Sequence, residues 1–369
     1  MNMIEKILAR ASGRKEVGPG DVVIANVDRM VLHDLSSNLV SKVFENEMGG
    51  GKIYDPSRIV FVFDHTFSPA TQADADVLTE ARKFAARHGI TNVFDSGSGS
   101  IHHVVMENGL WAPGEIVIGC DSHTTGYGAL GVFSTGVGNN SMVALGFCHG
   151  KGWFKVPETI RLQFEGELAP GVAPRDVAQH VEGLIGEAGA VYKLVEYAGP
   201  FIERLSMEDR ILFPMMSIDL GAKAGFINPD EKTEAFAKTY SKKPGWTMFR
   251  NDPGCAYERT VEIDVSKLVP QVACPPTVGN VKPIGEVAVP GRRTLMFLPL
   301  VLWPHFWRSA RATLRPVSST KAGKFLLCVV LMPLLCLLLI SGKQIHYLVP
   351  LLPGASVFLA ALLASRHED

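Results

Sequence analysis

Hydrophobic and polar positions follow the periods of strands and helices over most of the chain. Residues 57–64 (SRIVFVFD) form an apolar, β-branched and aromatic run that predicts a buried strand. Residues 73–88 follow with helical spacing, and Gly89 stands where glycine commonly ends a helix. The same patterns predict strands at 21–27, 91–95 and 115–120, a second block starting at 161–166, and helices at 4–11, 128–145, 173–186 and 206–223. This alternation predicts a mixed α/β fold with functional residues at strand ends.

The pattern changes abruptly near Pro290, after which apolar residues dominate. Residues 325–340 contain no charged residue, and residues 347–364 are nearly as apolar. A helix that crosses a membrane needs roughly 17–25 residues, so we expect a transmembrane hairpin with helices near 325–341 and 347–365. A buried globular hairpin is the alternative interpretation. Arginine and lysine residues between positions 308 and 324 predict a membrane anchor with the N-terminal domains in the cytoplasm.

Length, charge and cysteines narrow the class of protein. A chain of 369 residues suits about two globular domains of ~150 residues each. The 36 basic and 37 acidic residues leave a net charge of -1, which gives no electrostatic reason to expect a nucleic acid partner. The N-terminus carries charged residues instead of a signal peptide, and no CxxC pair occurs among the six cysteines. We therefore expect free thiols in a reducing compartment.

Three polar clusters fall at the ends of predicted strands or in the adjoining loops. They are Asp64-His65-Thr66, His102-His103 and Asp121-Ser122-His123-Thr124. A histidine beside a carboxylate is held in one tautomer and can exchange a proton near neutral pH. Several such pairs in one crevice would suit proton transfer on a polar, anionic substrate. Each pair taken alone is also compatible with a histidine that only hydrogen-bonds a loop.

A metal site is the second interpretation of the same residues. His65, His103, His123 and Asp121 are residue types that bind zinc or iron, although no HxH or HExxH element fixes their geometry.

The segment from residue 119 to 138 (GCDSHTTGYGALGVFSTGVG) resembles the signature of the aconitase and 3-isopropylmalate dehydratase large-subunit family. Flanking segments agree in order and spacing: VDRMVLHDLSS, FDHT, SIHHVVMENG, GAKAGFINPDE and QVACPPTVGNVKPIGEV. The resemblance covers about residues 1–289. It implies aconitase-like α/β/α domains at 1–157 and 158–289, the first two of three, followed by the membrane-associated tail at 290–369.

Members of this family add or remove water across a carbon–carbon double bond of a small hydroxy di- or tricarboxylic acid. A [4Fe–4S] cluster binds the substrate hydroxyl through an iron that has no protein ligand. The resemblance implies that Asp64 and His65 handle the proton of the leaving hydroxyl. It also implies that His103 and Asp121 form a second catalytic pair and that His123 lies in the same site.

The resemblance also implies substrate contacts for His33, Ser122 and Asp219. Two positions depart from the family pattern: Met215 and Asp219 stand where the family usually has Asn and Glu. Because an amide is lost and a carboxylate is shortened, the identity of the substrate does not carry over. A small swivelling-domain subunit is the expected partner, since it supplies a catalytic serine in this family.

The cluster cysteines of the family belong to an SCTN-type motif and a CxxC motif, and this chain has neither. We therefore expect the chain alone to bind no cluster, to have no metal ligands and to show no hydro-lyase activity. The segment SGKQIHYLVPLLPGASVFLAALLA resembles a transmembrane part of glycosyltransferases that use lipid-linked sugars, without their catalytic carboxylates. One interpretation is a fusion of two truncated reading frames. The other is a membrane-tethered module that binds a carboxylic acid or a non-cluster metal; the parent enzymes would be cytoplasmic.

Overall fold

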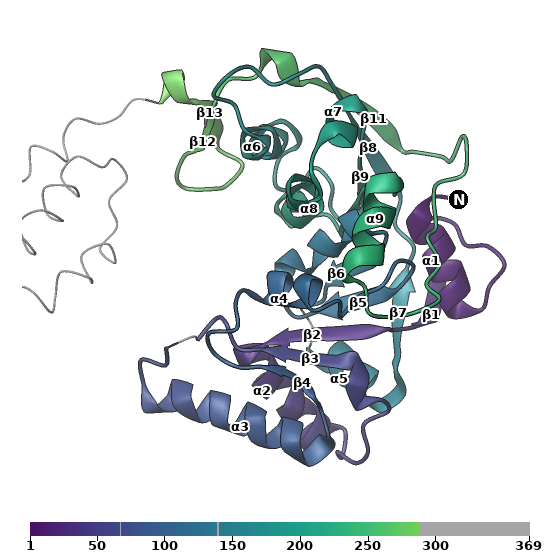
Figure 1. Cartoon of the computed structure of the whole chain (residues 1–369), viewed down its shortest axis with the longest axis vertical. Helices are drawn as coiled ribbons and strands as arrows, with labels where there is room; N and C mark the ends of the chain where they lie inside the picture. The colour runs from purple at the N-terminus through teal and green to yellow at the C-terminus, as the bar shows by residue number, and fades with distance from the viewer. Residues whose placement is uncertain (67, 139, 288–369) are drawn as a thin grey trace, which may run out of the picture. The chain divides into compact units, whose positions relative to one another are not determined.

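Two parallel sheets, one in each half of the N-terminal region, organise the molecule (Figure 1). The computed structural model describes residues 1–66, 68–138 and 140–287, and residues 1–287 make up one compact unit. The expected transmembrane hairpin, its basic loop, Cys328 and Cys336 lie outside the described residues. Within the described part, no helix combines the length and the apolar character needed to cross a membrane.

The first sheet has five parallel strands in the order β4-β3-β2-β5-β6. Its strands are β2 (Arg29–His33), β3 (Ile59–Val62), β4 (Asn92–Phe94), β5 (Ile116–Gly119) and β6 (Phe133–Gly136). Its helices are α2 (Asp34–Lys42), α3 (Gln72–His88), α4 (Ile101–Glu107) and α5 (Asn140–His149). The chain runs outward from β2 to β4 and then returns to the other side of β2 at β5. Side chains that follow β2 and β5 therefore flank a topological switch point, where α/β proteins commonly bind ligands.

The second sheet has four parallel strands in the order β10-β9-β8-β11. Its strands are β8 (Thr159–Glu165), β9 (Leu194–Ala198), β10 (Ala224–Phe226) and β11 (Arg259–Asp264). The accompanying helices are α6 (Pro174–Ile185), α7 (Pro200–Arg204), α8 (Met207–Met216) and α9 (Glu231–Tyr240). The boundary near residue 157 between the two predicted domains stays a prediction.

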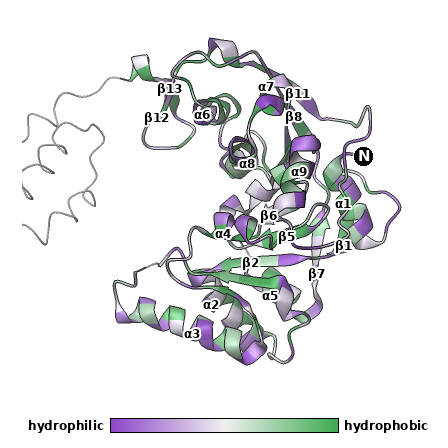
Figure 2. Ribbon diagram, viewed as in Figure 1, coloured by the Kyte–Doolittle hydropathy of each residue, from purple (hydrophilic) through white to green (hydrophobic). Residues whose placement is uncertain are grey.

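Shorter elements complete the described part of the chain. The N-terminal helix α1 (Met3–Ser12) has an Asn2 capping box. Strand β1 (Val22–Asn26) pairs antiparallel with β7 (Lys151–Lys155), and β12 (Gln271–Ala273) pairs with β13 (Val281–Pro283). Figure 2 shows apolar strands inside the first sheet and many hydrophilic residues along α3, which buries only one narrow side.

Two of the predicted helices are wrong in extent. Residues 128–145 do not form one helix: a 3₁₀ helix, η3 (Ser122–Leu130), is followed by β6 and α5. Gly131 ends η3 with a φ of 73°, a conformation that interrupts any continuing helix. The predicted helix at 206–223 stops at Met216 and continues as a short 3₁₀ turn up to Leu220. Small residues here permit close packing, since a Cβ on Gly128 would lie 1.9 Å from the carbonyl oxygen of Gly225.

Candidate active site

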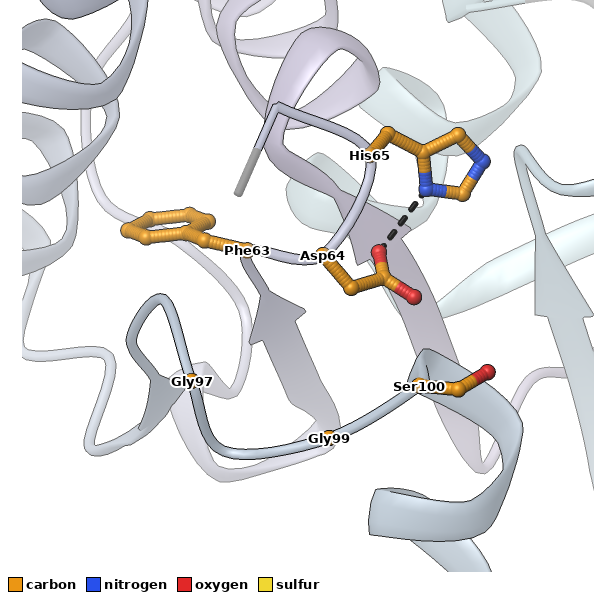
Figure 3. Close-up of a pocket in the computed structure, with 6 residues that line it drawn as sticks. All are labelled: Phe63, Asp64, His65, Gly97, Gly99 and Ser100. Atoms are coloured by element: carbon orange, nitrogen blue, oxygen red, sulfur yellow. Dashed lines mark hydrogen bonds and ion pairs between the residues drawn. The ribbon is translucent and has the colours of Figure 1, made fainter. Parts of the chain in front are cut away.

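The candidate site lies at the carboxyl ends of β2, β3 and β5. His33 ends β2, and Asp64 and Asp121 follow β3 and β5 at a distance of two residues. An open cavity of about 550 Å³ lies beside them, lined by Phe63, Asp64, His65, Gly97, Gly99 and Ser100 (Figure 3). The strand-end residues predicted from the sequence therefore share one edge of the sheet.

His65 lies between two carboxylates. Its Nδ1 is 2.8 Å from Oδ1 of Asp64, the interaction drawn in Figure 3, and its Nε2 is 3.3 Å from Oδ2 of Asp121. Burial works against the charged imidazolium, but the hydrogen bond to Asp64 and the neighbouring negative charges outweigh it and raise the pKa of His65. This imidazole is therefore suited to carry a proton near neutral pH. The backbone N–H of Ile101 donates to the other oxygen of Asp64 at 2.7 Å and fixes that carboxylate.

Asp121 connects His65 to a second histidine, which is His102. Nε2 of His102 lies 2.7 Å from Oδ1 of Asp121, and its Nδ1 lies 3.1 Å from the hydroxyl of the buried Tyr127. The backbone N–H of His123 also donates to Oδ1 of Asp121 at 2.7 Å. Burial opposes ionisation of Asp121, but the hydrogen bond and charge of His102 outweigh it and lower the pKa of the carboxyl. Asp121 is therefore an ionised acceptor that orients two imidazoles.

The expected pair of His103 and Asp121 is corrected by this geometry. His103 is exposed, and its side chain makes no hydrogen bond or ion pair with any residue that the structure describes, whereas His102 is buried. The spacing of polar residues along α4 indicates that His103 faces solvent. His103 and Glu107 are four residues apart, so they share one face of the helix, and both are exposed. His102 lies on the side that is turned toward the sheet.

His33 and Asp34 contribute a second layer to the site. The rings of His33 and His65 are stacked, with centroids 4.0 Å apart and planes 18° apart. Asp34 is fully buried and accepts a hydrogen bond from the backbone N–H of Thr66 at 2.6 Å, which ties α2 to the loop after β3. The sequence predicted His33 but not Asp34 or Tyr127. The succession of a histidine and an aspartate directly after a strand was the available signal for Asp34.

The remaining predicted residues surround this network less closely. Ser122 is exposed at the start of η3, and its side chain makes no hydrogen bond within the described part of the chain. Asp219 lies in the 3₁₀ turn after α8; burial raises the pKa of its carboxyl, while the positive charges of His123 and Arg175 act in the opposite direction. Asp219 therefore lies close enough to His123 for an electrostatic interaction between them.

The four residues of the metal interpretation do not form a ligand group. Within the described ranges, the group whose ligand atoms lie within 4.8 Å of one another is His33, Asp34 and His65. A metal bound by histidine lies near the plane of the ring, along the nitrogen lone pair. Two rings that are stacked 4.0 Å apart cannot both direct a lone pair at one ion without turning. The geometry of this group therefore favours a proton-transfer site over a metal site.

The described cysteines do not fit an iron–sulfur cluster. Cys120, Cys148, Cys255 and Cys274 are free, and no three of them form a ligand group in the part that the structure describes. Burial raises the pKa of the Cys120 thiol to about 11 in the metal-free protein. Whether the chain binds a cluster stays a prediction.

Helix α2 turns leucines outward beside the site. Leu35 and Leu39 are 42% and 50% exposed, while Ser37 and Ser41 of the same helix are buried. Leu145 of the neighbouring α5 is also exposed. We call Leu35 and Leu39, which lie one helical turn apart on α2, the leucine face.

Comparison with known proteins assigns the chain to a family. The model of the aconitase family (aconitate hydratase) matches residues 5–294. A probable 3-isopropylmalate dehydratase large subunit from Methanothermobacter thermautotrophicus is 42% identical over 293 residues, which is 78% of this chain and 68% of that protein. A 3-isopropylmalate dehydratase large subunit 1 from Pyrococcus furiosus is 42% identical with the same coverage. A probable methanogen homoaconitase large subunit from Methanothermobacter thermautotrophicus is 39% identical over 290 residues, 78% of this chain and 67% of that protein.

The chain belongs to the aconitase family. It spans about two thirds of the length of the relatives named above, which are mostly large subunits of 3-isopropylmalate dehydratase, a hydro-lyase. The match covers the region that carries the histidine–carboxylate network.

Proposed function

We propose that this chain provides the proton-transfer part of a hydro-lyase site for a small hydroxy di- or tricarboxylic acid. The observation that carries the proposal is the continuous series Asp64, His65, Asp121 and His102, in which each carboxylate holds an imidazole. Its position at the switch point of a parallel sheet gives a substrate access from the open edge. The names of the relatives supply the substrate class, with 3-isopropylmalate as the first compound to test.

Two proton transfers are needed to remove water from a hydroxy acid. A proton must reach the leaving hydroxyl, and another must leave the adjacent carbon. His65 suits the first transfer because its raised pKa favours the protonated imidazolium and because it borders the cavity. Asp64 holds the ring in place and stabilises its charge. His102 and Asp121 form a positioning pair behind His65, since Tyr127 and the protein interior bury His102.

Substrate carboxylates need positive charge in the site. His65 supplies it whenever its imidazole is protonated, and His33 and His123 are the neighbouring imidazoles. We propose that His33, Ser122 and Asp219 contact the substrate. Asp219 would accept a hydrogen bond from the part of the substrate that lies nearest to His123.

The leucine face supports the proposal that the site is completed by a further protein part. An apolar patch that is exposed beside a polar site commonly marks a contact surface. The relatives are large subunits, and a small subunit is the partner that this assignment implies. In this family, an iron of the cluster polarises the substrate hydroxyl. The ligands of that cluster would be residues other than the four described cysteines.

The test is a reconstitution in two stages. The chain is first treated anaerobically with iron and sulfide, and its visible absorbance is recorded. A stable brown protein would contradict the expectation that the chain alone binds no cluster. The chain is then combined with a small subunit of a 3-isopropylmalate dehydratase, and formation of the carbon–carbon double bond is followed by ultraviolet absorbance. If the assembled protein, with or without a cluster, shows neither turnover nor binding of any hydroxy acid, the proposal is wrong.

The membrane tether belongs to this proposal as a separate part. It rests on the apolar runs within residues 290–369. Extraction of expressing cells at alkaline pH separates integral from peripheral proteins. Recovery of the chain in the membrane fraction is expected, and complete release into the supernatant would remove the tether from the proposal.

A further inference from the structure

A second crevice lies on the four-stranded sheet and shares no lining residue with the cavity beside His65. Its volume is about 560 Å³. It is bordered by β8, the ends of β9 and β10, and the beginnings of α7 and α9. The labels of β8, β9, α7 and α9 lie near one another in Figure 1. The carboxyl ends of parallel strands are the usual location of ligand sites in α/β sheets, and this volume suits a small molecule.

Arg161 of β8 is the unusual residue of this crevice. It is half-buried, its Nε is buried without a hydrogen-bond partner, and no described residue forms a hydrogen bond or ion pair with its side chain. Its guanidinium carbon lies 5.3 Å from the centre of the Tyr257 ring, which holds the group in place. Leaving this buried Nε–H donor unpaired is costly, while the rest of the half-buried guanidinium is not enclosed. The geometry therefore leaves room for an oxyanion, and the fork of arginine matches a carboxylate.

Glu196 of β9 supplies a carboxyl group in the same crevice. It is 2% exposed and accepts a hydrogen bond from Nδ2 of Asn251 at 3.0 Å. Burial raises the pKa of this carboxyl, while the nearby charge of Arg161 acts in the opposite direction and favours the carboxylate. An ammonium group beside Glu196 would favour the carboxylate in the same way, and no hydrogen bond joins Glu196 to Arg161 in the described part of the chain.

The other charged residues of the crevice are engaged or acidic. Arg210 donates two hydrogen bonds to Asp230, and Lys232 donates to three backbone carbonyls. Glu203 and Glu231 are exposed and line the rim. Because the acidic groups outnumber the free cation, a doubly charged anion is disfavoured. A ligand with one carboxylate and one ammonium group satisfies both Arg161 and Glu196.

We propose that this crevice binds a free α-amino acid, with its carboxylate on the guanidinium of Arg161 and its ammonium group directed at Glu196. The ligand side chain occupies the rest of the crevice, toward Pro200 and Ile227. This site is independent of the hydro-lyase proposal.

The experiment is isothermal titration calorimetry of the full chain with the standard L-amino acids, added one at a time. At least one amino acid is expected to bind. Arg161→Gln should weaken that binding by about 10- to 100-fold, because charge-assisted hydrogen bonds are lost. Lys282→Gln is the matched control, since it removes an exposed charge on β13, which does not line the crevice, and should leave the affinity unchanged.

Two further measurements keep the proposal falsifiable. Arg161→Lys retains the charge without the fork and should lose part of the affinity, and circular dichroism shows whether each variant is folded. Glu196→Gln should weaken binding of the amino acid but not binding of its N-acetyl derivative, which lacks the ammonium group. Absence of binding by every amino acid, equal binding by the Arg161→Gln variant, or preference for inorganic phosphate would each overturn the proposal.

Discussion

The two parallel sheets both carry ionised side chains at their carboxyl ends, yet these side chains have different partners. In the first sheet, Asp64 and Asp121 are bonded to histidines, whose charge can change near neutral pH. In the second sheet, Asp230 is bonded by two nitrogens of Arg210, which is always charged and completely buried. Arg210 also donates to the backbone carbonyls of Ile202 and Glu203.

The comparison teaches that the same strand-end position serves chemistry in one sheet and stability in the other. The identity of the partner decides between them. An imidazole that is hydrogen-bonded to a carboxylate can exchange its proton. A guanidinium that is hydrogen-bonded to a carboxylate cannot, because arginine does not lose its proton in proteins. Substitutions in the two networks should therefore affect different measurements.

The largest effect on stability is expected at Arg210. Arg210→Met leaves Asp230 without its cation and two carbonyls without a donor, so the free energy of unfolding should fall by about 3–5 kcal/mol. Urea unfolding at neutral pH measures this change. Lys267→Met, at an exposed residue, should stay within about 0.5 kcal/mol.

The stability difference between the wild type and Arg210→Met is also expected to depend on pH. Burial opposes ionisation of Asp230, but the hydrogen bonds from Arg210 outweigh it and lower the pKa to about 2. Because the pKa of Asp230 is lower in the folded protein, its ionised carboxylate stabilises the fold at pH values above the unfolded pKa of about 3.9. This contribution to stability is lost as the pH falls toward about 2. The difference between the wild type and Arg210→Met should therefore shrink over this range. A constant difference would show that charge on Asp230 is not its source.

Among the positioning residues, the largest effect on chemistry is expected at His102, with His103 as the matched control. In an assembled preparation that turns over a hydroxy acid, His102→Gln should lower kcat by about 10²- to 10⁴-fold, because Asp121 loses its buried partner. His103→Gln should leave kcat within about twofold, since the residue is exposed and has no described partner. A larger loss at His103 than at His102 would restore the pairing that the sequence first indicated.

A smaller, directional effect is expected for Asp64→Asn. The pKa of His65 should fall, because the hydrogen-bonded negative charge that raises it is removed. The raised pKa of His65 stabilises the fold fully below about 6.5, and this contribution is lost as the pH rises through the folded value. NMR titration of the imidazole in both proteins measures the shift. Glu45→Gln, which lies near His88 instead, should leave His65 unchanged.

The smallest change in stability is expected on the leucine face. Leu39→Gln should alter the free energy of unfolding by at most about 0.5 kcal/mol, because half of the residue is exposed. Binding of the small subunit of a 3-isopropylmalate dehydratase, measured by isothermal titration calorimetry, should weaken. Leu8→Ala, at a completely buried residue, should cost about 2–5 kcal/mol. Unchanged binding of the small subunit by the Leu39 variant would contradict a contact role for this face.

Much of the fold could be predicted where the pattern is local. The strand at 57–64 contains β3, and the helix at 73–88 is α3 with its αL glycine at Gly89. The extent of the helices at 128–145 and 206–223 could not be predicted in this way. Close backbone approaches such as that of Gly128 to Gly225 arise between segments that are distant in sequence.

By itself, the sequence determined the family and the residue types at the strand ends, because parallel strands bring those ends to one edge. Only the tertiary structure decided that Asp121 holds His102 and not His103. Adjacent helical residues point about 100° apart, so the rotation of α4 against the sheet selects one of them. The tertiary structure also decided that the ring of His33 stacks on that of His65. It likewise decided that the buried Nε of Arg161 has no described partner, because this depends on every segment that is folded around it.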